Sequence, residues 1–128
     1  MLTGMEGLRK LAFIILSAEE GARTVLRART VGGAYVFLSD ERLGTVLAKH
    51  PELRGCETMI IETVEEPDIV IQGHGEELLA MRFYEVTPVG PKHLVVVYRE
   101  DKGIIITAFF TSKADRLIRR RRVVWRRR

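Results

Sequence analysis

The sequence has little cysteine and no long apolar run. Cys56 is the single cysteine among 128 residues, which excludes an internal disulfide framework and any zinc site built from several cysteines. A lone cysteine is typical of a reducing intracellular compartment, so we expect a cytoplasmic protein. The longest apolar run near the start, residues 11–16, is far shorter than the roughly 20 residues that cross a bilayer. We therefore expect no membrane partner.

Side-chain amides are almost absent as well. The chain has no asparagine, Gln72 is its single glutamine, and 16 arginines outnumber 5 lysines. Loss of thermolabile amides is typical of thermophilic proteins, although a GC-rich genome would also favour arginine. The composition therefore predicts a thermophilic source.

Positive charge is concentrated at one end. Residues 119–128 contain seven arginines and no acid, so residues 1–118 hold 14 basic and 17 acidic side chains, a net charge of −3. A basic segment on a slightly acidic body is typical of nucleic-acid binders. A basic end of this kind is about equally often a solvated appendage with no partner.

The apolar pattern predicts a single α+β domain over residues 1–128. Helices are expected over residues 5–21 (where 13–16 would equally suit a buried strand), from Ser39 to near Pro51, and over 57–64. A hairpin is expected over 23–38, and strands over 68–71, 78–86, 94–98, 104–111 and 123–125. This order favours N-terminal helices packed on a curled antiparallel sheet of about four strands. Residues 1–38 would then be an extension, residues 39–125 the core and 119–128 an arginine-rich end.

Alternation predicts which strand residues share a face. Arg82 and Tyr84 lie on one face of the strand over 78–86, opposite Met81 and Phe83. On the strand over 104–111, we expect one face to pack on the helices and the other to face a ligand. The first set is Ile106, Ala108 and Phe110, and the second is Thr107, Phe109 and Thr111.

Several segments resemble one nuclease family. They are His50-Pro51-Glu52-Leu53, the apolar helix before Glu66-Pro67-Asp68-Ile69-Val70, the runs over 94–97 and 103–111, and Trp125 after a basic stretch. Their order over about residues 40–125 is similar to the phage- and prokaryote-associated branch of barnase/EndoU/colicin/RelE-like (BECR-fold) nuclease domains. The resemblance implies one or two helices followed by a four-stranded antiparallel sheet. It also implies metal-independent ribonuclease activity, often as a toxin, for which an antitoxin would be a possible protein partner.

Metal-free RNA cleavage needs a base for the ribose 2′-hydroxyl, an acid for the leaving oxygen and cations for the charged phosphorane. His50, at the end of a helix, is the first choice, although a histidine there can simply bond the last helix carbonyls. Arg82 and Tyr84 could hold phosphate and stack on a base, or form an ordinary cross-strand pair. Thr107 completes the predicted catalytic set. No cofactor and no metal are expected.

The predicted RNA-binding residues lie at strand ends and in the basic segment. They are Lys92, Thr111, Arg119, Arg120, Arg121 and Arg122. The strands lack an evident Glu/His/Arg constellation, which favours the alternative of a non-catalytic module that retains the fold. Such a module would bind either nucleic acid or another protein.

Overall fold

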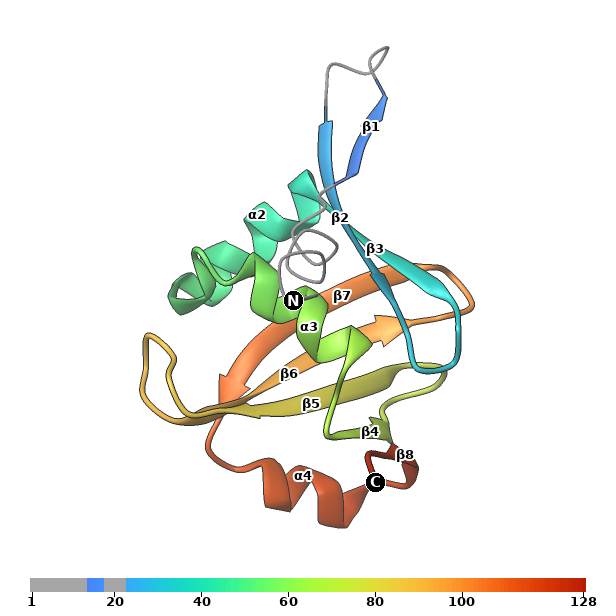
Figure 1. Cartoon of the computed structure of the whole chain (residues 1–128), viewed down its shortest axis with the longest axis vertical. Helices are drawn as coiled ribbons and strands as arrows, with labels where there is room; N and C mark the ends of the chain where they lie inside the picture. Colours follow the sequence, from blue (N-terminus) through green and yellow to red (C-terminus); the bar gives the residue numbers. More distant parts are fainter. Residues whose placement is uncertain (1–13, 18–22) are drawn as a thin grey trace, which may run out of the picture.

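The computed structural model describes residues 14–17 and 23–128, and Figure 1 shows their arrangement. The described strands form one sheet in the order β1-β2-β3-β7-β6-β5-β4-β8. The strands are β1 (Ile14–Ser17), β2 (Arg23–Arg29), β3 (Tyr35–Ser39), β4 (Ile69–Gln72), β5 (Leu78–Tyr84), β6 (Lys92–Arg99), β7 (Ile104–Thr111) and β8 (Val123–Arg126). The helices are α2 (Asp40–Lys49), α3 (Glu57–Glu65), α4 (Ala114–Arg120) and the short 3-10 helix η1 (Pro51–Leu53).

The α+β class is confirmed, but the expected sheet was too small. The described sheet has eight strands instead of about four, and it is mixed, because β3 pairs with β7 in parallel at Phe37 and Ile104. The described chain also opens with strands, so the expected N-terminal helices follow β3 instead. The hairpin β2–β3 thus extends the sheet rather than standing apart from the core.

The predicted helix over residues 5–21 is wrong where the structure describes it. Residues 14–17 form β1, which pairs with β2, and this agrees with the strand alternative for the run 13–16. The β-branched pair Ile14-Ile15 suits a strand better than a helix. Residues 5–13 and 18–21 lie outside the described residues.

Helices α2 and α3 begin and end where local chemistry predicts. The Ser39 side chain accepts a hydrogen bond of 3.2 Å from the Arg42 backbone N–H, which caps α2. Pro51 cannot continue that helix, so the chain turns into η1. In the same way, α3 ends just before Pro67, where helical geometry is disfavoured.

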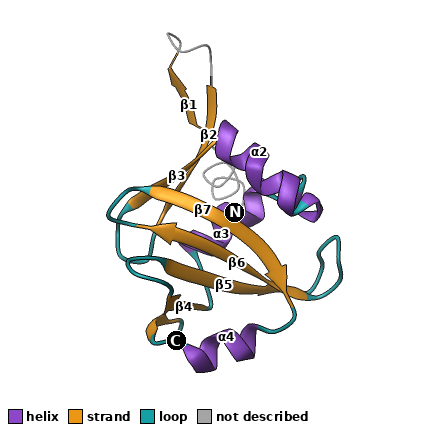
Figure 2. Ribbon diagram, turned by 180° about the vertical axis from the view of Figure 1, so that it is seen from behind, coloured by secondary structure: helices purple, strands orange, loops and turns teal. Residues whose placement is uncertain are grey.

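The sheet separates two apolar cores, and Figure 2 shows the helices that lie against it. Helices α2 and α3 cover one face, whose core includes Ile60, Val96 and Tyr98. Helix α4 covers part of the other face through Ala114, Leu117 and Ile118. The strands between them are buried on both sides, which explains the continuous apolar run of β6.

One predicted strand face is wrong at a single residue. Ala108 and Phe110 pack on the helix face as expected, but Ile106 packs in the α4 core. A bulge causes this, because Val97 pairs with Thr107 while the next residue, Tyr98, pairs with Ile105. The extra residue is Ile106, so the alternation changes phase there. The face of Thr107 and Phe109 is therefore partly covered by α4 and is not an open ligand face.

Strand β8 lies at the edge of the sheet beside β4, as expected for a strand rich in flanking arginines. Within the described residues, no helix has the length and apolar character that a membrane span requires.

Candidate nucleic-acid interface

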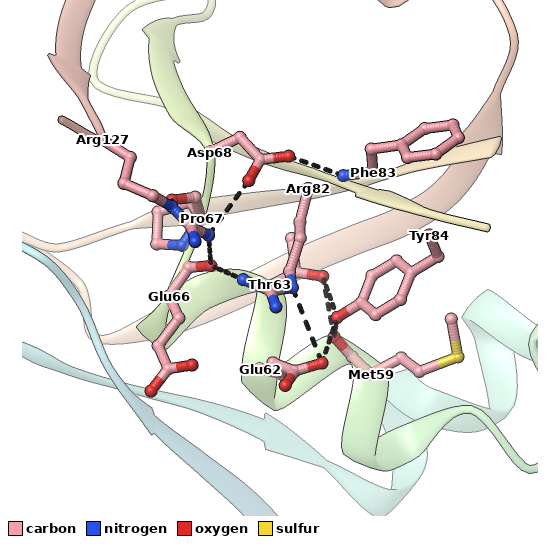
Figure 3. A network of polar contacts seen from close by, with 10 residues as sticks. All are labelled: Met59, Glu62, Thr63, Glu66, Pro67, Asp68, Arg82, Phe83, Tyr84 and Arg127. Carbon is pink, nitrogen blue, oxygen red and sulfur yellow. Dashed lines mark hydrogen bonds and ion pairs between the residues drawn. The ribbon is translucent and has the colours of Figure 1, made fainter. Parts of the chain in front are cut away.

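Arg82 and Tyr84 lie together on β5, facing α3 (Figure 3). The Arg82 guanidinium carbon is 5.6 Å from the centre of the Tyr84 ring. Arg82 Nη1 donates to the backbone carbonyl of Glu66, and its Nε is 3.7 Å from Glu62 Oε1. The predicted shared face of these two residues is therefore confirmed, and α3 adds a carboxylate to it.

The Tyr84 hydroxyl is bound on several sides. It donates to Glu62 Oε1 over 2.7 Å and lies 3.3 Å from Thr63 Oγ1. Thr63 in turn donates to the Met59 carbonyl over 2.7 Å. Burial raises the pKa of Tyr84 well above its ordinary value; the contact with Thr63 opposes this effect, and the contact with Glu62 adds to it. The phenol is thus protonated at neutral pH.

The arginine-rich end joins this network through Arg127. Arg127 Nη2 donates to the Glu66 carbonyl over 2.9 Å and lies 3.0 Å from Asp68 Oδ1. The other carboxylate oxygen of Asp68 accepts from the Phe83 backbone N–H over 2.8 Å. Arg82 and Arg127 therefore share one acceptor, and Arg127, directly after β8, reaches the cluster on β5 through the Glu66 carbonyl (Figure 3).

This cluster combines a carboxylate, a guanidinium and a phenol. The Glu62 and Arg82 side chains are 27% and 22% exposed, so a ligand can reach both. A carboxylate can accept a proton from a hydroxyl, and a guanidinium can neutralise a phosphate. The set can therefore act on a phosphodiester or simply hold one.

His50 lies elsewhere, at the junction of α2 and η1. Its ring centre is 6.1 Å from that of Phe109 on β7, and its Nδ1 is 3.9 Å from Glu52 Oε2. Its backbone N–H donates to the Val46 carbonyl, as in an ordinary helix end. Strand β6 separates β7 from the strand that carries Arg82. The described contacts place His50 with Phe109 and Glu52, and not with the Arg82 cluster.

Thr107 is also separated from Arg82. Thr107 pairs with Val97, which packs in the α4 core, whereas Arg82 pairs with Leu94 in the core under α2 and α3. Residues paired across antiparallel strands share a face, so Thr107 and Arg82 point to opposite faces. The four predicted catalytic residues thus form one adjacent pair and two isolated members.

Lys92 and Thr111, both predicted to bind RNA, lie at different places. Lys92 pairs with Tyr84 and shares its face, at the start of β6. Thr111 Oγ1 accepts from the Lys113 backbone N–H over 2.9 Å, which helps turn the chain from β7 into α4. Lys92 is therefore placed to meet a ligand at the Arg82 cluster, and Thr111 has a local structural role.

The four predicted arginines divide into two pairs. Arg119 and Arg120 are exposed in the last turn of α4. Arg122 donates to Gln72 Oε1 over 3.2 Å, and Arg121 lies 3.5 Å from His74 Nε2. Arginines in a last turn also oppose the helix dipole, which stabilises α4.

Most exposed arginines of this end have no acidic partner. In the part of the chain that the structure describes, Arg127 is the only arginine after residue 113 that forms an ion pair with a carboxylate. The exposed arginines without such a pair are Arg116, Arg119, Arg120, Arg122, Arg126 and Arg128. We call these six residues the arginine surface. Their charge is available to an external anion.

Two aromatic side chains add stacking surface on the α4 side of the sheet. Phe83 is 45% exposed, and its ring centre is 5.2 Å from that of His93, its partner across β5 and β6. Exposed rings on a sheet can stack on unpaired bases. His93 is thus held by Phe83 rather than by a catalytic partner.

Other reactive groups are poorly placed for chemistry. Burial raises the pKa of the Cys56 thiol, and the charges of Glu57 and Glu52 raise it further, so this cysteine is a poor nucleophile. Among residues 14–17 and 23–128, no three His, Cys, Asp or Glu side chains lie close enough to hold a metal ion.

Sequence reasoning missed Glu62. In the sequence, Glu62 is marked only by its position in α3, directly before the buried Thr63. The packing of α3 on β5 is what brings Glu62 to Tyr84.

The chain was compared with protein-family models, with curated proteins and with solved structures, and none of them matches it.

Proposed function

We propose that this protein binds RNA through the arginine surface and through the Arg82–Tyr84 cluster, which Arg127 joins to the arginine-rich end. The observation that carries the proposal is the set of six exposed arginines that have no carboxylate partner among the described residues. Paired arginines would be neutralised within the protein, whereas unpaired ones can displace counterions from a phosphate backbone. Exposed Phe83 offers a base-stacking surface on the same domain.

Fluorescence anisotropy with a labelled single-stranded RNA tests this proposal. The double variant Arg119→Gln/Arg120→Gln removes two charges from α4 and should weaken binding about fivefold or more. The matched control Arg42→Gln/Arg54→Gln removes the same charge from exposed arginines on the α2 side and should change the affinity less than about twofold. Equal losses in both variants, or no binding by the wild type, would overturn the proposal.

A second candidate function is metal-independent RNA cleavage by a toxin that an antitoxin restrains, as the BECR-like resemblance implies. The observation that favours it is the 2.7 Å contact between Tyr84 and Glu62, with Arg82 alongside. Glu62 would accept the proton of the 2′-hydroxyl while the 2′-oxygen attacks phosphorus, and Arg82 would stabilise the phosphorane. The leaving 5′-oxygen would take a proton from an acid in the site or from water.

Labelled RNA incubated with the protein and a chelator tests this second candidate. Cleavage by the wild type that disappears in Glu62→Gln, while binding persists, supports Glu62 as the base. His50→Ala is the parallel variant, since His50 was the base expected from the sequence and lies 3.9 Å from Glu52. Binding without any cleavage by the wild type would leave the non-catalytic function alone.

A further inference from the structure

A cavity opens at the other end of β5 from Tyr84. Its volume is about 240 Å³, and it lies between the β2–β3 turn, β4, β6 and β8. Its walls include Val31, Val70, Leu78, Tyr98, Glu100 and Trp125. Most of the wall is therefore apolar and aromatic, with one carboxylate.

A second hollow of about 200 Å³ adjoins the first, and Leu78 and Glu100 line both. Its other lining residues include Glu76, Glu77 and Asp101. Asp101 is paired with Arg99 over 2.6 Å, and Glu76 and Glu77 interact with the same guanidinium, so one cation faces three carboxylates. The apolar hollow and the acidic one thus share two wall residues.

The Tyr98 hydroxyl is the unusual feature of the apolar cavity. Tyr98 is fully buried in the cavity wall, and its hydroxyl has no hydrogen-bond partner among the described residues. Burial raises the pKa of Tyr98, and the charge of Glu100 raises it further, so this phenol is close enough to Glu100 to sense it. Buried hydroxyls almost always have a partner, so the Tyr98 oxygen has an unused hydrogen-bonding position in the cavity wall.

Glu100 is held by a hydrogen bond to one of its two carboxylate oxygens. The Thr30 hydroxyl donates to Glu100 Oε2, and the chain passes so close at Gly32 that a Cβ there would lie 2.6 Å from the same oxygen. Within the described part of the chain, Glu100 Oε1 accepts no hydrogen bond. The carboxylate is therefore fixed in place and keeps capacity for a donor.

We propose that the double hollow binds a small organic ammonium compound, that is, a compact apolar group that carries a protonated amine. The ammonium group donates to Glu100 Oε1 and, through a local shift of the cavity wall that uncovers it, to the buried Tyr98 oxygen, while Glu76 and Glu77 add negative charge around it. The apolar group packs against Leu78, Val70 and Trp125. A cation beside these aromatic rings gains further attraction.

The size of the cavity limits the ligand. Pockets for drug-sized ligands are roughly 300–1,000 Å³, so a hollow of about 240 Å³ suits a smaller molecule, such as an aralkyl amine. Arg122 of the arginine surface borders the acidic hollow, because it donates to Gln72 in the wall of that hollow. The RNA test instead changes Arg119 and Arg120 on α4, and the amine test changes Glu100 and Glu76, so the two proposals can fail independently.

Trp125 is the single tryptophan of the chain and lines the cavity, so its fluorescence reports binding directly. The probe is 2-phenylethylamine, and the neutral comparison is 2-phenylethanol, which has the same size and lacks the charge. The amine should change Trp125 fluorescence saturably at concentrations below about 10 mM, and the alcohol should bind about tenfold more weakly.

Variants assign the contacts. Glu100→Gln keeps the shape and should weaken amine binding about tenfold, and Tyr98→Phe should weaken it about threefold. Glu76→Gln, at an exposed position, should weaken it about twofold and remains informative if Glu100→Gln does not fold. Glu85→Gln is the matched control at the far end of β5 and should have no effect.

The proposal is overturned if the wild type shows no saturable response to the amine, or if the alcohol binds as tightly as the amine. It is also overturned if Glu100→Gln, with a native circular dichroism spectrum, binds the amine as the wild type does.

Discussion

Tyr84 shows how one side chain joins the sheet to a helix. Its hydroxyl donates to Glu62 and lies near Thr63, both on α3. Tyr84→Phe removes this donor and leaves part of the Glu62 carboxylate without its bond. We expect the free energy of unfolding to fall by about 1–3 kcal/mol. Urea denaturation followed by circular dichroism measures this change.

Tyr35→Phe is the control for that variant. Tyr35 is 46% exposed and contacts Arg27 and Arg29 through its ring, which the substitution keeps. Its unfolding free energy should stay within about 0.5 kcal/mol of the wild type. If Tyr84→Phe were equally neutral, the network of Figure 3 would have no stabilising role.

Tyr84 and Tyr98 also predict how stability depends on alkaline pH. Burial raises the pKa of both phenols in the folded state. In the unfolded chain each ionises near its ordinary pKa of about 10. The folded state then binds more protons above that pH, so the stabilisation is complete below pH of about 10 and is lost as the pH rises further.

An alkaline titration measures this effect through phenolate absorbance and circular dichroism together. Two of the three tyrosines should ionise only as the protein unfolds. Full ionisation near pH 10, with an unchanged dichroism spectrum, is the result that this interpretation does not allow.

For single residues, the sequence predicts which neighbours share a face of one strand, but not which residues of different elements come into contact. Alternation correctly placed Arg82 beside Tyr84. The partner Glu62 is 20 positions before Arg82, and only tertiary packing brings the two together. His50 shows the reverse case, because its place at a helix end was predictable and its contact with Phe109 was not.

Helix α2 is the element that local rules describe best. Ser39 caps it, so Ser39→Ala should lower the free energy of unfolding by about 1 kcal/mol. Thr45→Ala is the control, because the Thr45 hydroxyl bonds only the Glu41 carbonyl within the same exposed helix. That variant should be neutral or slightly stabilising. Thermal and urea unfolding of the two variants compare these effects, and a Ser39→Ala variant as stable as the wild type would exclude the cap.

Two other elements could not be predicted from local rules. The run Ile104-Ile105-Ile106 has no polar alternation, so nothing in it indicates the bulge that moves Ile106 to the α4 side. Helix α4 has seven residues, no side-chain cap and a strongly basic end. The sequence therefore gives little sign that Leu117 and Ile118 pack in a core. Packing on the sheet, rather than intrinsic propensity, stabilises such a short helix.

At the scale of the whole molecule, the missing information is which strands pair. Hairpins such as β6–β7 join neighbours in sequence and were predicted. The pairs β3–β7 and β4–β8 join strands far apart in the chain, so the sheet was expected to have about four strands instead of eight. The charge asymmetry, in contrast, needed only the sequence, and the structure places those arginines around α4 and β8.

The salt dependence of RNA binding tests the central proposal most directly. The dissociation constant is measured for a single-stranded RNA at several salt concentrations, for the wild type and for Arg119→Gln/Arg120→Gln. If most of the six arginines of the arginine surface contact phosphates, the logarithm of the association constant (the reciprocal of the measured dissociation constant) against log salt has a slope of about −3 to −4, and the double variant reduces its magnitude by about 1.4. A slope near zero, or one that the double variant leaves unchanged, would contradict RNA binding through the arginine surface.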